Sequence, residues 1–228
     1  MENKTIIIIL IVAVVVAAAL VGVYFIRHNK LPSNSSQNTA QQNQTSDLLN
    51  PAPEDTSLNQ TSTQANNPAN TIQPQSKMIT DDFSIDLPAG WKQTAPAMGA
   101  SAMAVNADEN INDPAAQKIN FKSYFAVSYD TLKGKNINNY SQTIKDGLSQ
   151  TFPDAIFSNE KDITINGNSA HTMEVEFAQQ GVNFKILMVA VVGQGDDAWV
   201  ISFNTTKSAW DGYKEIFSNI ANSFIVKQ

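Results

Sequence analysis

Residues 163–203 read ITINGNSAHTMEVEFAQQGVNFKILMVAVVGQGDDAWVISF, and this stretch predicts successive strands joined by tight turns. Asn166-Gly167 is a strong hairpin signal, and Gln179-Gln180-Gly181 marks a second turn. Residues 173–177 alternate apolar and acidic side chains, whereas residues 184–192 are apolar on both faces, as in a central strand covered on each side. The stretch therefore predicts the middle of an antiparallel sheet.

Two segments beside these strands have helical spacing. Residues 137–152 carry one apolar stripe and end at Pro153, while residues 210–224 carry a second, with Ser208 as a plausible N-cap. Strands are expected at 83–87, 103–105 and 121–129, with a loop over 106–114. This order predicts an α+β fold, an antiparallel β-sheet flanked by helices, formed by one domain over residues 77–228.

Residues 5–26 form an uninterrupted apolar run, TIIIILIVAVVVAAALVGVYFI, without a single charge. At 1.5 Å per residue such a helix is about 33 Å long, enough to cross a hydrocarbon core of about 30 Å. The run predicts a single transmembrane helix within an N-terminal anchor, residues 1–30. A cleaved signal peptide is the alternative, because Ala17-Ala18-Ala19 offers a cleavage site, although residues 20–26 would continue apolar beyond the cut.

Residues 31–76 have the composition of a disordered linker, dominated by Asn, Gln, Ser, Thr, Ala and Pro. Its only charged residues are Asp47, Glu54 and Asp55. Lys and Arg on the two flanks of the apolar run hardly differ, so the positive-inside rule hardly discriminates between the two orientations. The long polar tether favours a plasma-membrane protein with an extracytoplasmic C-terminal domain. The chain has no Cys, which removes disulfides, thiol catalysis, thiolate metal sites and a lipid-anchored N-terminus.

Residues 83–91, FSIDLPAGW, and residues 199–204 with the ending 220–224, IANSF, carry a family resemblance. The first segment matches the opening pattern F-x-(I/V)-x-x-P-x-G-W of PsbP-like domains, and the second resembles that family's C-terminal signature. The resemblance covers residues 78–226 and implies an α/β/α sandwich. It also implies a binding or assembly role, since the known roles in the family are of this kind. The predicted anchor and tether depart from the photosynthetic PsbP subunit, so no photosystem role is predicted.

Side-chain oxygens recur at every second position at Asn106, Asp108, Asn110 and Asn112, the spacing that calcium loops use. The sixth and twelfth positions of such a loop would need Gly and Glu, and this chain has neither there. A solvated loop is therefore the favoured interpretation, and a weak cation site is the alternative.

Three other positions have a functional and a structural interpretation. Trp91 is a candidate recognition aromatic, and the structural alternative is a ring that closes the end of the sheet. His171 is a candidate general base, and the structural alternative is a partly buried histidine on the same face of the strand as Met173. Asp196-Asp197 is a candidate cation site, but the alternative, a Gly-rich turn, explains the pair fully. No G-x-S-x-G and no complete dinucleotide fingerprint is present, so no catalytic residue and no cofactor are predicted.

Residues 77–228 contain 12 Lys against 17 Asp and Glu, a net charge of −5 without a basic stripe. This charge disfavours nucleic acid and anionic lipid as partners. The leading hypothesis is a membrane-anchored, extracytoplasmic, non-enzymatic domain that binds a protein partner or assists an envelope complex. The alternative is a ligand- or cation-binding module, for calcium or manganese, and a hydrolase of unrecognised type is a remote third.

Overall fold

The computed structural model describes residues 76–97 and 99–227. Its elements are, in chain order, β1 (Ser76–Ile79), β2 (Phe83–Leu87), β3 (Trp91–Thr94), β4 (Ala102–Asn106), α2 (Pro114–Lys118), β5 (Tyr124–Thr131), α3 (Ile137–Thr151), β6 (Ile156–Ile165), β7 (Asn168–Gln179), β8 (Val182–Val192), β9 (Asp197–Thr206), a 3-10 turn η1 (Lys207–Ala209), α4 (Trp210–Asn222) and β10 (Ile225–Val226).

The predicted anchor, with its apolar run 5–26, and the predicted linker lie outside the described residues, apart from Ser76, which opens β1. None of the helices within 76–97 and 99–227 has both the length and the apolar content that a membrane crossing needs.

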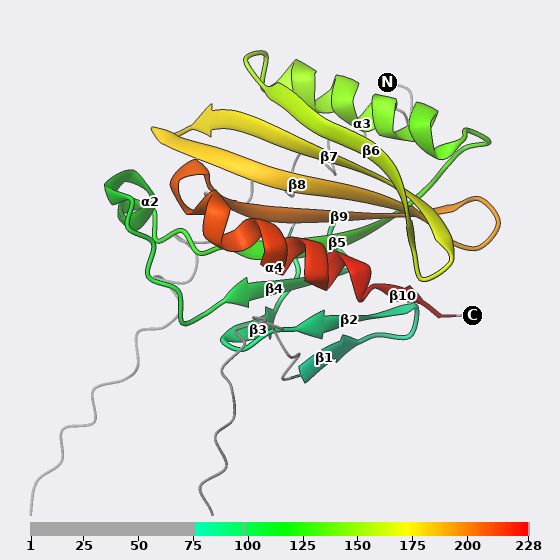
Figure 1. The fold of residues 1–228 in the computed structure, drawn as a ribbon, viewed down its shortest axis with the longest axis horizontal. Helices are drawn as coiled ribbons and strands as arrows, with labels where there is room; N and C mark the ends of the chain where they lie inside the picture. Colours follow the sequence, from blue (N-terminus) through cyan, green and yellow to red (C-terminus); the bar gives the residue numbers. More distant parts are fainter. Residues whose placement is uncertain (1–75, 98, 228) are drawn as a thin grey trace, which may run out of the picture. The chain divides into compact units, whose positions relative to one another are not determined.

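Seven strands form one sheet in the order β3-β4-β5-β9-β8-β7-β6, and every neighbouring pair is antiparallel (Figure 1). A second, three-stranded sheet has the order β1-β2-β10. The turns predicted at 166–167 and 179–181 are two-residue hairpin loops, and the second covers only 180–181 because β7 extends to Gln179. Both positions of each loop have positive φ, 48° and 87° in the first, and 50° and 78° in the second. The predicted antiparallel α+β fold is confirmed.

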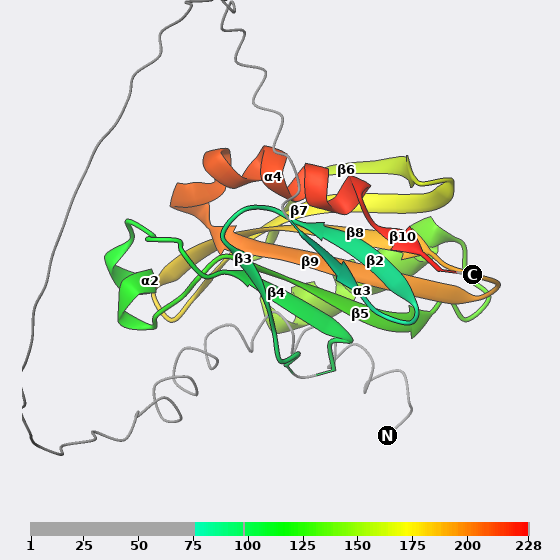
Figure 2. The ribbon, with the colours of Figure 1, turned by 90° about the horizontal axis from the view of Figure 1, so that it is seen from below.

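Helices cover both faces of the large sheet. On one face, Ile144 and Leu148 of α3 pack with Met173 and Val175 of β7. On the other face, α4 and the small sheet pack against the strands, and Phe217 of α4 is completely buried there (Figures 1 and 2). A large apolar side chain buried this way contributes about 1.5–3 kcal/mol, so the two faces together hold the layers in place.

The first half of β6 was not predicted, because the expected strand covered only residues 163–165. β6 begins at Ile156 as the edge strand, and its residues 156–162 are mostly exposed. Its pairing with β7 shifts between Ser158 and Lys161, where Asn159 has a φ of 54°. A bulged, charged edge strand lacks the apolar alternation that predicts strands, and these features also protect the edge from pairing with other chains.

Ser208 was expected to cap the C-terminal helix, and this was wrong. Ser208 lies inside η1, and its hydroxyl shares a 3.0 Å hydrogen bond with the hydroxyl of Thr206. α4 begins at Trp210 as a continuation of η1 and has no side-chain cap. A 3-10 turn directly before a helix already places the backbone in a helical path, which explains the later start of the α-helix.

Candidate functional site

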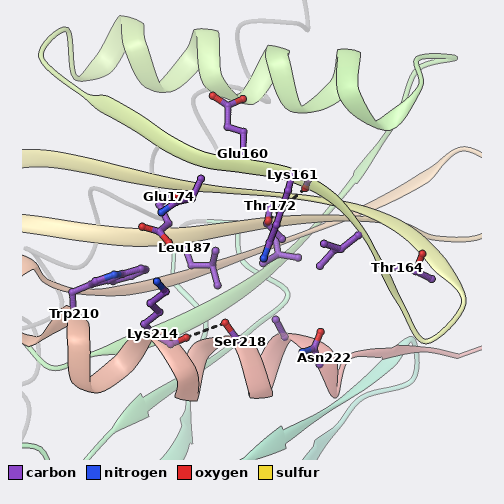
Figure 3. A pocket seen from close by; sticks show the side chains of 14 residues that line it. Glu160, Lys161, Thr164, Thr172, Glu174, Leu187, Trp210, Lys214, Ser218 and Asn222 are labelled. Atoms are coloured by element: carbon purple, nitrogen blue, oxygen red, sulfur yellow. Dashed lines mark hydrogen bonds between the residues drawn. The ribbon is translucent and has the colours of Figure 1, made fainter.

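A groove with a volume of about 560 Å³ lies between α4 and the strands β6, β7 and β8 (Figure 3). Its floor is formed by Leu187 and Val189 of β8 and by Ile163 of β6, and its rim is polar. Leu187 and Ile163 are only partly buried and pack on the core beneath them. The volume falls within the range of about 300–1,000 Å³ that ligand sites occupy, and an apolar floor with a few polar groups is their usual chemistry.

One end of the groove is closed by the β6–β7 hairpin. The side-chain amide of Asn166 donates to the carbonyls of Asn222 and Phe224, at 3.0 Å and 2.8 Å. These bonds join the hairpin tip to Asn222, the last residue of α4, and to Phe224 just beyond its C-cap. Carbonyls at the C-terminal end of a helix have no partner within the helix. The distance between the edge of the sheet and the helix is thereby fixed at this end.

The other end of the groove holds a charge cluster whose inner members are buried. Glu174 is 5% exposed, and its Oε2 lies 3.0 Å from Nζ of Lys185. Lys185 also lies 2.9 Å from Oε1 of Glu176 and stands over the ring of Trp210, 4.9 Å from its centre. Lys207 completes the cluster at 2.5 Å from Oε2 of Glu176.

The protonation of this cluster follows from its hydrogen bonds. Those from Lys207 and Lys185 hold the pKa of the Glu176 carboxyl below its ordinary value. Burial alone would lower the pKa of Lys185, but the hydrogen bonds to Glu176 and Glu174 outweigh it and the pKa is raised. Glu176 and Lys185 are therefore ionised at neutral pH. Glu174 is the member of the cluster that lines the groove.

The four oxygen-bearing residues of the predicted weak cation site lie at the end of β4 and in the loop that follows it. Asn106 is the last residue of β4, and its amide donates to the phenol of Tyr213 at 2.7 Å. Asp108 is exposed and lies 3.8 Å from Nζ of Lys92. Asn110 and Asn112 are exposed. Within the described residues no group of three or more His, Cys, Asp or Glu is placed to hold a metal ion, and the cation hypothesis stays a prediction.

Glu109 in the same loop faces the sheet, and no sequence pattern singled it out. Its carboxylate accepts hydrogen bonds from the backbone N–H and from the hydroxyl of Ser123, the latter at 2.8 Å. The Ser123 hydroxyl also shares a 2.7 Å bond with that of Thr205, and both residues are completely buried. Burial and then Glu109 raise the pKa of the Tyr213 phenol nearby. These contacts fasten the loop to the sheet.

Trp91 does not lie in a recognition surface, so the prediction of a recognition aromatic is corrected. Its side chain is 6% exposed, and its ring stacks on Phe125 and meets Phe217 edge-on, with centres 5.6 Å and 6.3 Å apart. The preceding Gly90 has a φ of 81°, a conformation that favours glycine, and it turns the chain so that the ring enters the core. Trp91 therefore packs beneath α4.

His171 lies on the face covered by α3, opposite the groove. Its Nδ1 is 2.7 Å from Oδ1 of Asp162, and this hydrogen bond lowers the pKa of the Asp162 carboxyl. Asp196 accepts from the backbone N–H groups of Lys133 and Gly134, at 3.0 Å and 2.9 Å, and so joins two loops. The contacts of Asp196 with the second loop go beyond the turn that was predicted for it.

A sequence signal for the groove does exist. Lys214, Ser218 and Asn222 recur every four residues along α4, beside its apolar stripe, and all three line the groove. On β7, Thr172 and Glu174 are buried polar side chains on one face of a strand whose other face is apolar. Which strands lie opposite this helical stripe is decided only by the sheet order.

The described fold is similar to several solved structures at low sequence identity. LpqN of Mycobacterium tuberculosis, described as involved in cell envelope biogenesis, matches with a TM-score of 0.50 and 13% identity, over 64% of this chain and 83% of that chain. Cyanobacterial PsbP (CyanoP) of Synechocystis sp. PCC 6803 matches with a TM-score of 0.49 and 13% identity, over 72% and 99%. The Ran-binding protein Mog1p of Saccharomyces cerevisiae matches with a TM-score of 0.46 and 14% identity, over 63% and 89%.

Neither a protein-family model nor a curated protein sequence matches the chain. The structural similarity therefore concerns the fold alone. The antiparallel sheet between α3 and α4 agrees with the α/β/α sandwich that the resemblance of residues 83–91, 199–204 and 220–224 implies.

Proposed function

We propose that residues 77–228 form a non-catalytic binding domain that holds a segment of a protein partner in the groove between α4 and β6–β8. One observation carries the proposal: the groove combines a partly exposed apolar floor, Leu187 and Ile163, with a polar rim supplied by α4. Exposed apolar surface inside a concave site is the usual signature of an interaction site in a folded domain.

In this proposal the domain is extracytoplasmic and works from a plasma membrane. Residues 5–26 serve as the anchor and residues 31–76 as the tether that lets the domain reach its partner. The support is the charge-free apolar run and the polar composition that follows it. LpqN, with a similar fold, is described as involved in cell envelope biogenesis, but at 13% identity it supports the fold rather than the role.

Site-specific photo-crosslinking of the full chain in cells tests this proposal. A photoreactive residue at Asn222, which is exposed at the groove, is expected to give discrete adducts with a partner. The same residue at Gln150, exposed on α3 at the opposite face of the sheet, is the control and is expected to give none of these adducts.

A blocking substitution decides whether the adducts arise from the groove itself. Ser218→Trp adds a large ring at an exposed groove position of α4 and is expected to abolish the Asn222 adducts. Ser149→Trp adds the same ring to an exposed position of α3 and is expected to leave them intact. Adducts that persist with Ser218→Trp, or that form equally from Gln150, would refute the groove as the binding site.

A further inference from the structure

The charges along the groove indicate which kind of segment it accepts. Among residues 76–97 and 99–227, the ammonium groups of just three lysines, Lys118, Lys161 and Lys214, have neither an ion pair nor a hydrogen bond. Two of these three, Lys161 and Lys214, line the same groove. Figure 3 shows Lys161 extending from β6 across the groove and Lys214 rising toward it from α4.

The two acidic residues that line the groove already have cationic partners. Glu160 lies 2.5 Å from Nζ of Lys145, which belongs to α3. Glu174 lies 3.0 Å from Nζ of Lys185 in the charge cluster. Two positive charges are therefore left uncompensated in a groove of a domain whose net charge is −5. Such a local field attracts an anionic group and repels a cationic one.

The length of the groove favours an extended peptide over a small anion. Trp210 and Asn222, the two ends of α4, both line it, so it runs along a helix of about 18 Å at 1.5 Å per residue. At about 3.3 Å per residue, roughly five residues of extended chain cover this length. The apolar floor of Ile163 and Leu187 would be left exposed by an inorganic anion, whereas aliphatic side chains of a peptide cover it.

We propose that the groove binds an acidic, extended segment of about five residues in the partner protein, whose carboxylates meet Lys161 and Lys214 and whose aliphatic side chains lie on Ile163 and Leu187. This inference rests on the proposed function, because it names the chemistry of the segment that the groove accepts.

Nuclear magnetic resonance titration of the full chain in a neutral detergent tests the inference. The probes are the blocked pentapeptide Glu-Val-Glu-Val-Glu and its neutral counterpart Gln-Val-Gln-Val-Gln. The acidic peptide is expected to shift the amide signals of Lys161, Leu187 and Lys214. The neutral peptide is expected to bind at least about tenfold more weakly, since it lacks the charge-assisted contacts.

Substitutions separate the charge from the shape of the groove. Lys161→Glu and Lys214→Glu are each expected to weaken the acidic peptide at least about tenfold, and Lys161→Arg with Lys214→Arg to preserve binding. Lys118→Glu reverses the third unpaired lysine, in α2 and outside the groove, and is expected to change nothing. Equal binding of both peptides, shifts away from the groove, absence of binding, or the same shifts from inorganic phosphate alone would each overturn the inference.

The crosslinking experiment distinguishes this failure from failure of the proposed function. If Ser218→Trp abolishes the Asn222 adducts but Lys161→Glu with Lys214→Glu does not, the groove binds a partner and the acidic character of its segment is wrong. If Asn222 gives no adducts that depend on the groove, the proposed function itself is refuted.

Discussion

Removing Lys185 is expected to destabilise the domain strongly, because it leaves a carboxylate buried without compensation. Glu174 is 5% exposed, and Lys185 is its one cationic partner among the described residues. Glu176, by contrast, keeps Lys207 when Lys185 is removed. The substitution Lys185→Met keeps most of the side-chain length and its packing against Trp210 while it deletes the charge.

The magnitude follows from the burial of the pair. Breaking a buried ion pair from one side costs about 3–5 kcal/mol. The side chains of Lys185 and Glu174 retain 14% and 7% exposure, so the lower end of this range applies, about 3 kcal/mol. For a domain of roughly 150 residues this loss corresponds to a decrease in melting temperature of about 6–12 °C.

Chemical and thermal denaturation of the variant provide the assay. Lys207→Met is the matched control, because Lys207 is 59% exposed and its ion pair with Glu176 is expected to contribute less than about 1 kcal/mol. Adding Glu174→Gln to Lys185→Met is expected to restore most of the lost stability, since no buried charge then remains. Equal small losses in the two single variants, or no rescue by Glu174→Gln, would refute the reasoning.

Three further perturbations test other features of the structure. Gly193→Ala places a Cβ 2.7 Å from Cβ of Asp197 and is expected to lower the free energy of unfolding, measured with denaturant, by about 1–3 kcal/mol. Gly212→Ala, in α4, meets no atom within 4 Å and is expected to raise it by about 0.5–1 kcal/mol. A Gly193→Ala variant that is more stable than Gly212→Ala would contradict the packing. Lys207 and Lys185 hold the pKa of Glu176 below its ordinary 4.5, so the contribution of this carboxylate to stability is present above pH 4.5 and is lost as the pH falls below that value. In a plot of stability against pH, Glu176→Gln should therefore lose less stability at acid pH than the unchanged protein. Burial, and then Asp130, raise the pKa of the Tyr140 phenol, so its contribution to stability is present below pH 10 and is lost as the pH rises above that value. If the stability of Tyr140→Phe falls as steeply at alkaline pH as that of the unchanged protein, this phenol is not the cause.

Local sequence patterns predicted the elements that depend on a short, regular spacing of apolar residues or on a turn signal. The apolar stripe predicted over 137–152 is α3, Ile137–Thr151, and the Asn-Gly and Gln-Gly turns are the hairpins between β6, β7 and β8. These predictions succeed because helix spacing and turn conformation depend on neighbours a few residues away. The two-sided apolar run at 184–192 likewise predicted a central strand, and it lies within β8, between β7 and β9.

The less regular elements could not be predicted in this way. β3 and α2 lie within 91–120, where the sequence has no clear period, and the exposed half of β6 lies on the edge of the sheet. Tertiary pairing with β4 and β7 makes strands of β3 and β6, so their own composition is a poor guide. Glu109 illustrates the same limit, since its partner Ser123 is bonded in turn to Thr205, 82 residues further along the chain.

The sequence by itself determined the fold class, the two faces of the sheet and the existence of a charge-free apolar run at residues 5–26, because each follows from the order and spacing of apolar residues. The tertiary structure alone decided that Trp91 is buried and that Lys161 and Lys214 line one groove. The physical reason is that antiparallel pairing and helix packing bring β6 and α4 together although Lys161 and Lys214 lie more than fifty residues apart in the chain, and no local pattern encodes which strand a helix will face.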